Sequence, residues 1–188
     1  MNSYELPAAL TVAGTDYPIR TDFRDVLYVL EILASPDYEP DEKGAIVLRV
    51  MYQDWEKIPQ EHWAEALERA AWFMDGGFPQ DSKAKPQPRL MDWSQDAALI
   101  LPAVNRVLGR EVRGQQALHW WTFLGAYMEI GESLFSTVLS LRQKRAKGKK
   151  LEKHELEFYR ENRSLVELRR RDTEQDKERR AALKELFV

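Results

Sequence analysis

Three histidines are the side chains of this chain best suited to bind a metal or to move a proton near neutral pH. They are His62, His119 and His154, and no two of them stand in HExxH or another common metal-ligand spacing. Cysteine is absent, which excludes disulfides and thiolate metal sites. We predict no metal site and no cofactor, and we interpret His119, which precedes Trp120, as a hydrogen-bonded imidazole in the core.

Paired carboxylates are the second kind of residue that could do chemistry. Asp92 and Asp96 are four residues apart, as are Asp37 and Asp41, but neither pair has the further ligands that a metal cage needs. Favourable charge near a helix start explains these positions better. Gly76-Gly77 lacks the preceding strand and the lysine of a phosphate-binding loop. The sequence therefore predicts no catalytic residue and a protein that is not an enzyme.

A basic run is the most prominent charged feature of the chain. It holds six Lys/Arg in nine residues, namely Arg142, Lys144, Arg145, Lys147, Lys149 and Lys150. Such a run could neutralise nucleic-acid phosphates, but no aromatic side chains alternate with it to stack on bases, which disfavours nucleic acid as a partner. Cations at a helix C-terminus are also favourable by about 0.3–1 kcal/mol each without any ligand. An acidic protein surface, including that of this chain's own first part, is an equally good counterpart.

The two parts of the chain carry opposite charge. Residues 1–141 contain 12 Lys/Arg and 21 Asp/Glu, a net charge of −9, whereas residues 142–188 contain 16 and 10, a net charge of +6. We therefore expect different partners for the two parts, and we predict that the basic run binds a partner together with the apolar residues Leu183, Leu186 and Phe187.

The elements that must position these residues are predicted to be helices. The densest apolar stretch, Leu118 to Arg142, is expected to form a buried helix pair that is interrupted at Gly131 and restarted by Ser133 as a cap. Further helices are predicted over 22–34, 40–55, 59–75 and 92–108. A small hairpin is predicted over 10–20, and three prolines predict an exposed loop over 78–90.

These elements predict an all-α protein in the main, a compact bundle of about six helices with a small N-terminal β-hairpin. The helical core domain is expected to span residues 1–150, and residues 151–188 to form a charged helical arm. The residues expected to build the core are Phe23, Leu27, Leu30, Trp63, Leu67, Phe73, Trp93, Leu101, Trp120, Trp121, Phe123 and Leu124.

The charged arm is predicted to gain little from burial, because no apolar residue occurs between Arg169 and Arg180. A helix there depends on local charge pairs worth about 0.2–0.5 kcal/mol each. We therefore expect truncation after Arg163 to leave the melting temperature nearly unchanged and to weaken partner binding.

Five stretches of this sequence resemble one known family. They are TDFRDVL at 21–27, MYQDW at 51–55, MDWSQDAALI at 91–100, ALHWWTFLGAYMEI at 117–130 and FSTVLSLRQKR at 135–145. The chain resembles the "gene product fifteen" family of tail-region proteins of long-tailed bacteriophages. That resemblance implies a tail assembly chaperone, which keeps the tape-measure protein soluble and helps tail-tube subunits to assemble around it. It supplies no catalytic motif.

The partners implied by the resemblance are the tape-measure protein and possible contacts with the tail-tube protein or with a second copy. The sequence contains no apolar run of 18 residues, the length needed to span a membrane, and its first residues do not resemble a signal peptide. We therefore expect the protein to be located in the host cell cytoplasm, without membrane contact. A structural protein of the phage tail is the alternative function. A nucleic-acid-binding regulator that uses the basic run is a third.

Overall fold

The computed structural model describes residues 4–78, 88–114 and 117–169. Its strands are β1 (Ala9–Val12) and β2 (Thr15–Pro18). Its helices are α1 (Phe23–Ala34), α2 (Pro40–Met51), α3 (Trp63–Met74), α4 (Ala97–Leu108), α5 (Trp120–Met128), α6 (Leu134–Ala146), α7 (Lys153–Glu161) and the short α8 (Arg163–Val166). Two 3₁₀ turns, η1 (Trp55–Lys57) and η2 (Gln60–His62), precede α3. The predicted mainly helical class with an N-terminal hairpin is confirmed.

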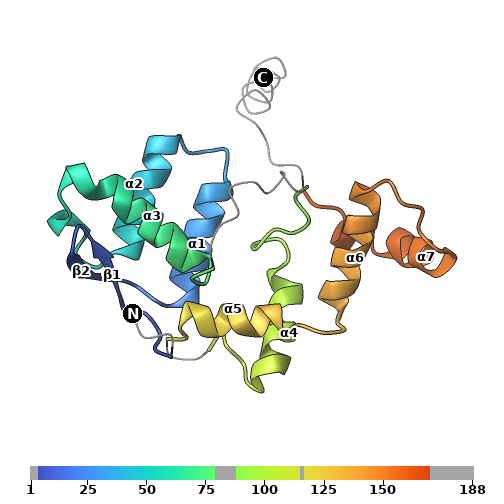
Figure 1. Ribbon diagram of the computed structural model, residues 1–188. Helices are drawn as coiled ribbons and strands as arrows, with labels where there is room; N and C mark the ends of the chain where they lie inside the picture. The colour runs from blue at the N-terminus through green and yellow to red at the C-terminus, as the bar shows by residue number, and fades with distance from the viewer. Residues whose placement is uncertain (1–3, 79–87, 115–116, 170–188) are drawn as a thin grey trace, which may run out of the picture.

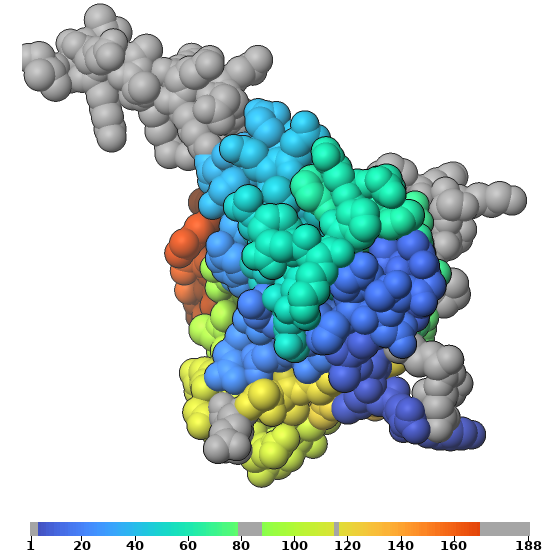
Figure 2. Space-filling model, turned by 90° about the vertical axis from the view of Figure 1, so that its left-hand side faces the viewer, coloured from blue at the N-terminus to red at the C-terminus, as the bar shows by residue number. Residues whose placement is uncertain are grey.

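The helices fall into two groups joined by α4 and α5 (Figure 1). The hairpin and α1 to α3 lie on one side, where α1 packs on α2, α2 packs on α3, and α3 packs on β1. Helices α6 and α7 lie on the other side, and α8 packs against α6. The space-filling view in Figure 2 shows that α2, α3 and the hairpin together form one broad face.

The predicted hairpin has a two-residue turn. Ala9 pairs with Pro18 and Val12 pairs with Thr15, so only Ala13 and Gly14 form the turn. Both turn residues have positive φ, 47° and 78°, as a type I′ turn requires. The hairpin buries the side chain of Val12 and contributes it to the main core.

The twelve predicted core residues all lie in the main apolar cluster. Phe23, Phe73, Trp120 and Phe123 are buried, and the other eight are partly buried and pack against the cluster. The HWW stretch builds this core through hydrogen bonds as well as packing. The indole N–H groups of Trp120 and Trp121 donate to the main-chain oxygens of Met74 and Phe73, at 2.8 and 2.9 Å. Because those oxygens lie at the end of α3, the two tryptophans cap that helix.

Two residues shortly after the end of α3, Gly76 and Gly77, must be glycines. Gly76 and Gly77 have φ values of 72° and 78°, which L side chains rarely adopt. A Cβ atom on Gly77 would also lie 2.8 Å from the Trp121 ring, and one on Gly76 would lie 2.7 Å from Leu124. The predicted helix stop at Gly76-Gly77 is confirmed, and it also lets α5 approach α3 closely.

Three helices are shorter than predicted, and one of them, α3, begins at Trp63 and not at residue 59, because residues 60–62 form η2. Helix α2 ends at Met51, and Trp55 lies in η1 instead of in the same helix. Helix α4 begins at Ala97 and not at Asp92, because two aspartates hold the preceding residues in turns. The Asp92 carboxylate accepts from the Gln95 N–H at 2.8 Å, and the Asp96 carboxylate accepts from the Asp92 N–H at 2.9 Å.

The first part of the predicted arm is not free. Val138 and Leu141 of α6 form a second small core with Val166, and Leu151, Phe158 and Tyr159 pack against it. Val166 is 1% exposed. The prediction of a solvated arm is therefore wrong for residues 151–169, because the sparse apolar side chains of this segment are enough to bind it to α6. Residues 170–188 lie outside the described residues.

Candidate functional site

The starts of α1 and α5 are joined by a short antiparallel bridge between Asp22 and His119. Across it, the Phe23 N–H donates to the Leu118 oxygen at 3.0 Å, and the Trp120 N–H donates to the Thr21 oxygen at 2.7 Å. The bridge holds α1 and α5 together at their first turns.

The Asp22 carboxylate strengthens this junction. It caps α1 by accepting from the Arg24 N–H at 2.9 Å, it pairs with the Arg24 guanidinium, and it accepts from the Leu118 N–H at 3.0 Å. Burial acts to raise the pKa of Asp22, but the hydrogen bonds from Arg24 and Leu118 outweigh it and hold the pKa below its usual value. One ionised side chain thus links the two helices.

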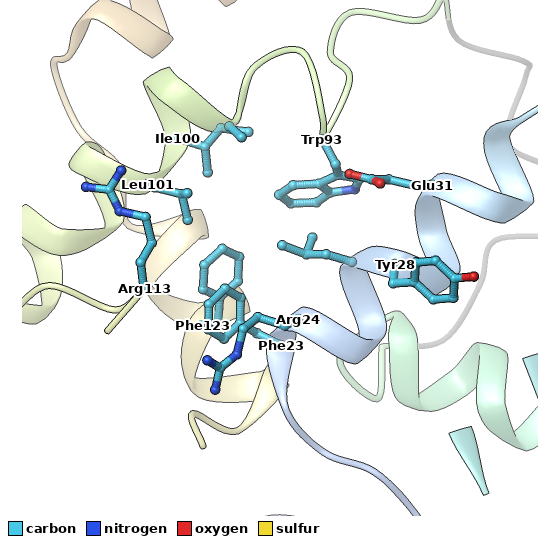
Figure 3. A pocket seen from close by; sticks show the side chains of 11 residues that line it. Phe23, Arg24, Tyr28, Glu31, Trp93, Ile100, Leu101, Arg113 and Phe123 are labelled. Carbon is cyan, nitrogen blue, oxygen red and sulfur yellow. The ribbon is translucent and has the colours of Figure 1, made fainter. Parts of the chain in front are cut away.

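A groove of about 290 Å³ lies next to this junction, between α1, α4 and α5. We call it the α1–α4 groove. Its apolar lining comes from three elements and the segment before α4, and consists of Phe23, Leu27, Trp93, Ala97, Ile100, Leu101 and Phe123. The rings of Phe23 and Phe123 stack at 4.5 Å between centroids and form part of its wall. Figure 3 shows Ile100 and Leu101 of α4 on one side and the residues of α1 on the other.

Charged and polar side chains stand only at the rim of the groove. Arg24, Tyr28 and Glu31 come from α1, and Arg113 follows α4. Both arginines are already paired, Arg24 with Asp22 and Arg113 with Glu111. Glu31 is exposed and makes no ion pair with any described residue. Partial burial raises its pKa, and the nearby Asp92 carboxylate raises it further. A cation placed beside Glu31 would stabilise its carboxylate and so oppose both effects on the pKa.

Leu27 is predicted as a core residue, but it is only partly buried and lines the groove, which explains why sequence reasoning missed the groove. The deeply buried residues of α1 are Phe23, Val26, Val29 and Ile32, whereas Leu33 is 37% exposed. Leu27 and Tyr28 line the groove together with Phe23. The available signal was that α1 carries more apolar residues than one buried face needs.

The basic run does not form one continuous surface. Lys144 forms an ion pair with Glu155. The Arg145 guanidinium lies over the Tyr159 ring, 4.2 Å from its centroid, and pairs with Glu167 at 3.4 Å. Lys147, Lys149 and Lys150 are exposed at the end of α6. Among the described residues of the predicted partner-binding set, Arg145 is also exposed, but it is engaged by Tyr159 and Glu167. Leu183, Leu186 and Phe187 lie outside the described residues.

Arg142 is a structural residue, and its prediction as a partner-binding residue is wrong. Its side chain is 5% exposed and pairs with Asp96, whose side chain is 1% exposed. The guanidinium donates to both Asp96 oxygens, at 2.6 and 2.8 Å, and to the main-chain oxygens of Leu90, Leu165 and Val166. These five acceptors match the five N–H groups of an arginine, so none remains for a partner.

His119 lies at the start of α5. Its Nδ1 accepts from the Trp121 N–H at 3.0 Å, so Nε2 carries the proton and donates to the Pro7 oxygen at 3.0 Å. Both ring nitrogens therefore make hydrogen bonds to the main chain.

Among the described residues, no group of three His, Cys, Asp or Glu side chains is placed to hold a metal ion. Within the same residues, every helix is too short or too polar to cross a membrane.

Comparison with known families shows where this chain belongs. The profile of the family described as "Bacteriophage Gp15 protein" matches residues 3–168, which is most of the chain. The chain belongs to the bacteriophage Gp15 protein family. No curated protein and no solved structure matches it.

The sequence segments that resemble the Gp15 family meet in the fold. Segment 21–27 and segment 117–130 join at the Asp22–His119 bridge. Segment 91–100 and segment 135–145 join at the Asp96–Arg142 ion pair. Segments 21–27, 91–100 and 117–130 all contribute residues to the lining of the α1–α4 groove. The groove therefore belongs to the part of the chain that matches the Gp15 family, whereas residues 169–188 lie beyond the match.

Proposed function

We propose that this bacteriophage protein is a tail assembly chaperone, which binds a helix of the tape-measure protein in the α1–α4 groove and assists tail-tube assembly in the host cytoplasm. The observation that carries the proposal is the groove itself, which is apolar inside and charged only at its rim. A long helical protein needs its apolar stripes covered until tube subunits surround it, and a groove of this kind binds one face of an amphipathic helix. The protein acts by binding and not by catalysis.

The length of the groove suits about two turns of a bound helix. The residues of α1 that line it run from Phe23 to Glu31, which corresponds to roughly 12 Å along a helix axis. The bound helix would place three or four apolar side chains over this length, at the spacing of one helix face. The Glu31 carboxylate at the rim, which forms no ion pair with a described residue, favours a helix with Lys or Arg beside its apolar face.

Co-expression with the tape-measure protein tests the proposal. We expect the parent chain to keep the tape-measure protein soluble and to be recovered with it. Tyr28 is 50% exposed at the rim of the groove, so Tyr28→Glu adds a charge there without disturbing the core. It should weaken the complex by about tenfold or more, the effect of roughly 1.4 kcal/mol. Tyr38→Glu is the matched control, because Tyr38 is exposed and lies outside the groove.

The proposal fails if the tape-measure protein is equally insoluble with and without the parent chain. Equal loss of binding in Tyr28→Glu and Tyr38→Glu would show that the groove is not the binding site. Detection of the protein in purified mature virions would instead favour a structural component of the tail.

A further inference from the structure

The described chain ends beside the segment that precedes α4 and supplies Trp93 to the α1–α4 groove. The Arg169 N–H donates to the side-chain oxygen of Gln95 at 2.8 Å, and the Arg169 oxygen accepts from Arg89 at 3.2 Å. Gln95 stands between Trp93 and Ala97, which both line the groove. Figure 1 shows the end of the described chain beside the segment that precedes α4. Arg169 therefore lies close in the fold to one wall of the groove.

Glu31 lies at the end of the groove that is nearest to Asp92. Arg89, which bonds to Arg169, also pairs with Asp92. The Asp92 carboxylate is close enough to Glu31 to raise its pKa. Arg24 lies seven residues before Glu31 on α1, at the opposite end of the groove. A segment that enters from Arg169 thus meets Glu31 first.

The remaining residues have a sequence that fits the groove. Residues 170–180 contain no apolar side chain, and apolar side chains then gather at Leu183, Leu186 and Phe187. Their spacing of three and four residues places them on one face of a helix. Arg180 precedes Leu183 by three residues, so the same helix would carry a cation beside that face. An apolar face with a flanking cation is the ligand that the groove and Glu31 favour.

Segment 170–188 is long enough to extend from Arg169 over the groove. Fourteen residues lead from Arg169 to Leu183, and they span roughly 21 Å as a helix or up to roughly 46 Å when extended. The groove extends only roughly 10 Å along α1 between Arg24 and Glu31. Segment 170–188 can therefore reach the full groove of its own chain.

We propose that segment 170–188 docks in the α1–α4 groove of the same chain, with Leu183, Leu186 and Phe187 inside it and Arg180 facing Glu31. The segment covers the apolar lining of the groove until a helix of another protein displaces it. In the terms of the proposed function, on which this last step rests, the tape-measure helix must compete with the chain's own segment.

Crosslinking in the full chain tests the docking directly. The chain contains no cysteine, so introduced cysteines are the only thiols. We combine Glu31→Cys with Arg180→Cys and treat the protein with a short bis-maleimide. The matched control combines Arg180→Cys with Glu68→Cys, which replaces an exposed glutamate of α3 outside the groove. We expect an internal crosslink within one chain for the first pair and little for the second.

Three outcomes would overturn the proposal. Equal crosslinking of both pairs would show that the segment has no preferred site, and no crosslinking of the first pair would show that it docks elsewhere. A crosslink between two chains would identify a second copy as the occupant. As a further check, Leu183→Ser, Leu186→Ser and Phe187→Ser are added together to the first pair. Crosslinking between the two introduced cysteines should then fall to the level of the Glu68 control, while the melting temperature of the protein stays unchanged.

The proposed competition between segment 170–188 and the tape-measure helix is tested by a separate measurement. The triple serine variant, without introduced cysteines, should recover several-fold more tape-measure protein than the parent in co-expression. Less recovery than with the parent would show that the segment helps binding and does not compete. Because the crosslinking experiment uses no partner, it can succeed where the proposed function fails. Recovery of the tape-measure protein without any internal crosslink would leave the proposed function standing and remove this inference.

Discussion

At the scale of single residues, the most consequential contact is the buried pair of Arg142 and Asp96. A buried charge is costly unless it is paired and its hydrogen bonds are complete. Here the guanidinium joins α6 to α4, to the segment before α4 and to α8 through five acceptors. The pair favours this arrangement of the elements, because separating them would leave buried hydrogen-bond donors of Arg142 without acceptors.

Removing one partner of this pair should be strongly destabilising. Arg142→Ala leaves the Asp96 carboxylate buried without a cation, and we expect a loss of about 3–5 kcal/mol in the free energy of unfolding. Lys147→Ala, which changes an exposed residue of the same basic run, should change it by less than about 0.5 kcal/mol. Urea denaturation of both variants measures the difference. If the two variants prove equally stable, Arg142 is not the structural residue described above.

The Asp22 carboxylate should make stability depend on pH. Its pKa is below 3.8 in the folded chain, so the folded state holds this proton less tightly than the unfolded state does. The stabilisation is complete well above pH 3.8 and is lost as the pH falls through the lowered pKa. We therefore expect Asp22→Asn to be less stable than the parent at pH 7, with a difference that shrinks in acid. Urea denaturation at several pH values measures it, and a difference that is constant with pH would contradict the pKa direction.

At the scale of elements, α8 is part of the folded body. Val166 is buried against α6, and the oxygens of Leu165 and Val166 accept hydrogen bonds from Arg142. Truncation after Arg163 should therefore lower stability by about 2–4 kcal/mol, contrary to the sequence prediction. Truncation after Arg169 retains these contacts and should leave the melting temperature close to that of the parent. Equal melting temperatures for the two truncated chains would show that α8 contributes nothing.

The junction of α3 and α5 depends on Gly77. Gly77→Ala forces an L side chain to a φ of 78° and places its Cβ against the Trp121 ring, so we expect a loss of about 1–3 kcal/mol. Gly131→Ala is the control, since a Cβ there meets no atom within 4 Å. Thermal melts should separate the two variants by several degrees. A Gly77→Ala protein as stable as Gly131→Ala would mean that the helix junction adjusts without cost.

At the scale of the whole molecule, the internal use of the basic run argues against nucleic acid as a partner. Arg142, Lys144 and Arg145 are held by contacts within the chain, and the net charge is −3. We expect binding to duplex DNA at physiological salt to be weaker than about 10⁻⁵ M, in the range of non-specific contacts. Fluorescence anisotropy with a labelled duplex checks this. Salt-sensitive binding at low micromolar concentration would restore the nucleic-acid alternative.

The sequence by itself determined the helical class, the hairpin and the residues of the core. These features depend on the spacing of apolar residues and on the residue types in turns, both of which can be read within one short stretch of the sequence. Gly76-Gly77 marked the end of α3, Ser133 marked the start of α6, and Gly109 followed α4, as the structure has them. The family could also be recognised, because the segments that carry the resemblance are contiguous in sequence.

Only the tertiary structure decided which charges face solvent and which apolar residues remain accessible. Arg142 looked like its basic neighbours, and its role depends on Asp96, which lies 46 residues away. Leu27 looked like a core residue, and whether it is covered depends on how α4 and α5 pack beside α1. Residues 151–166 looked solvated because their apolar side chains are few, yet α6 supplies the surface that binds them. Such outcomes depend on contacts between distant segments, which no periodicity within one segment can report.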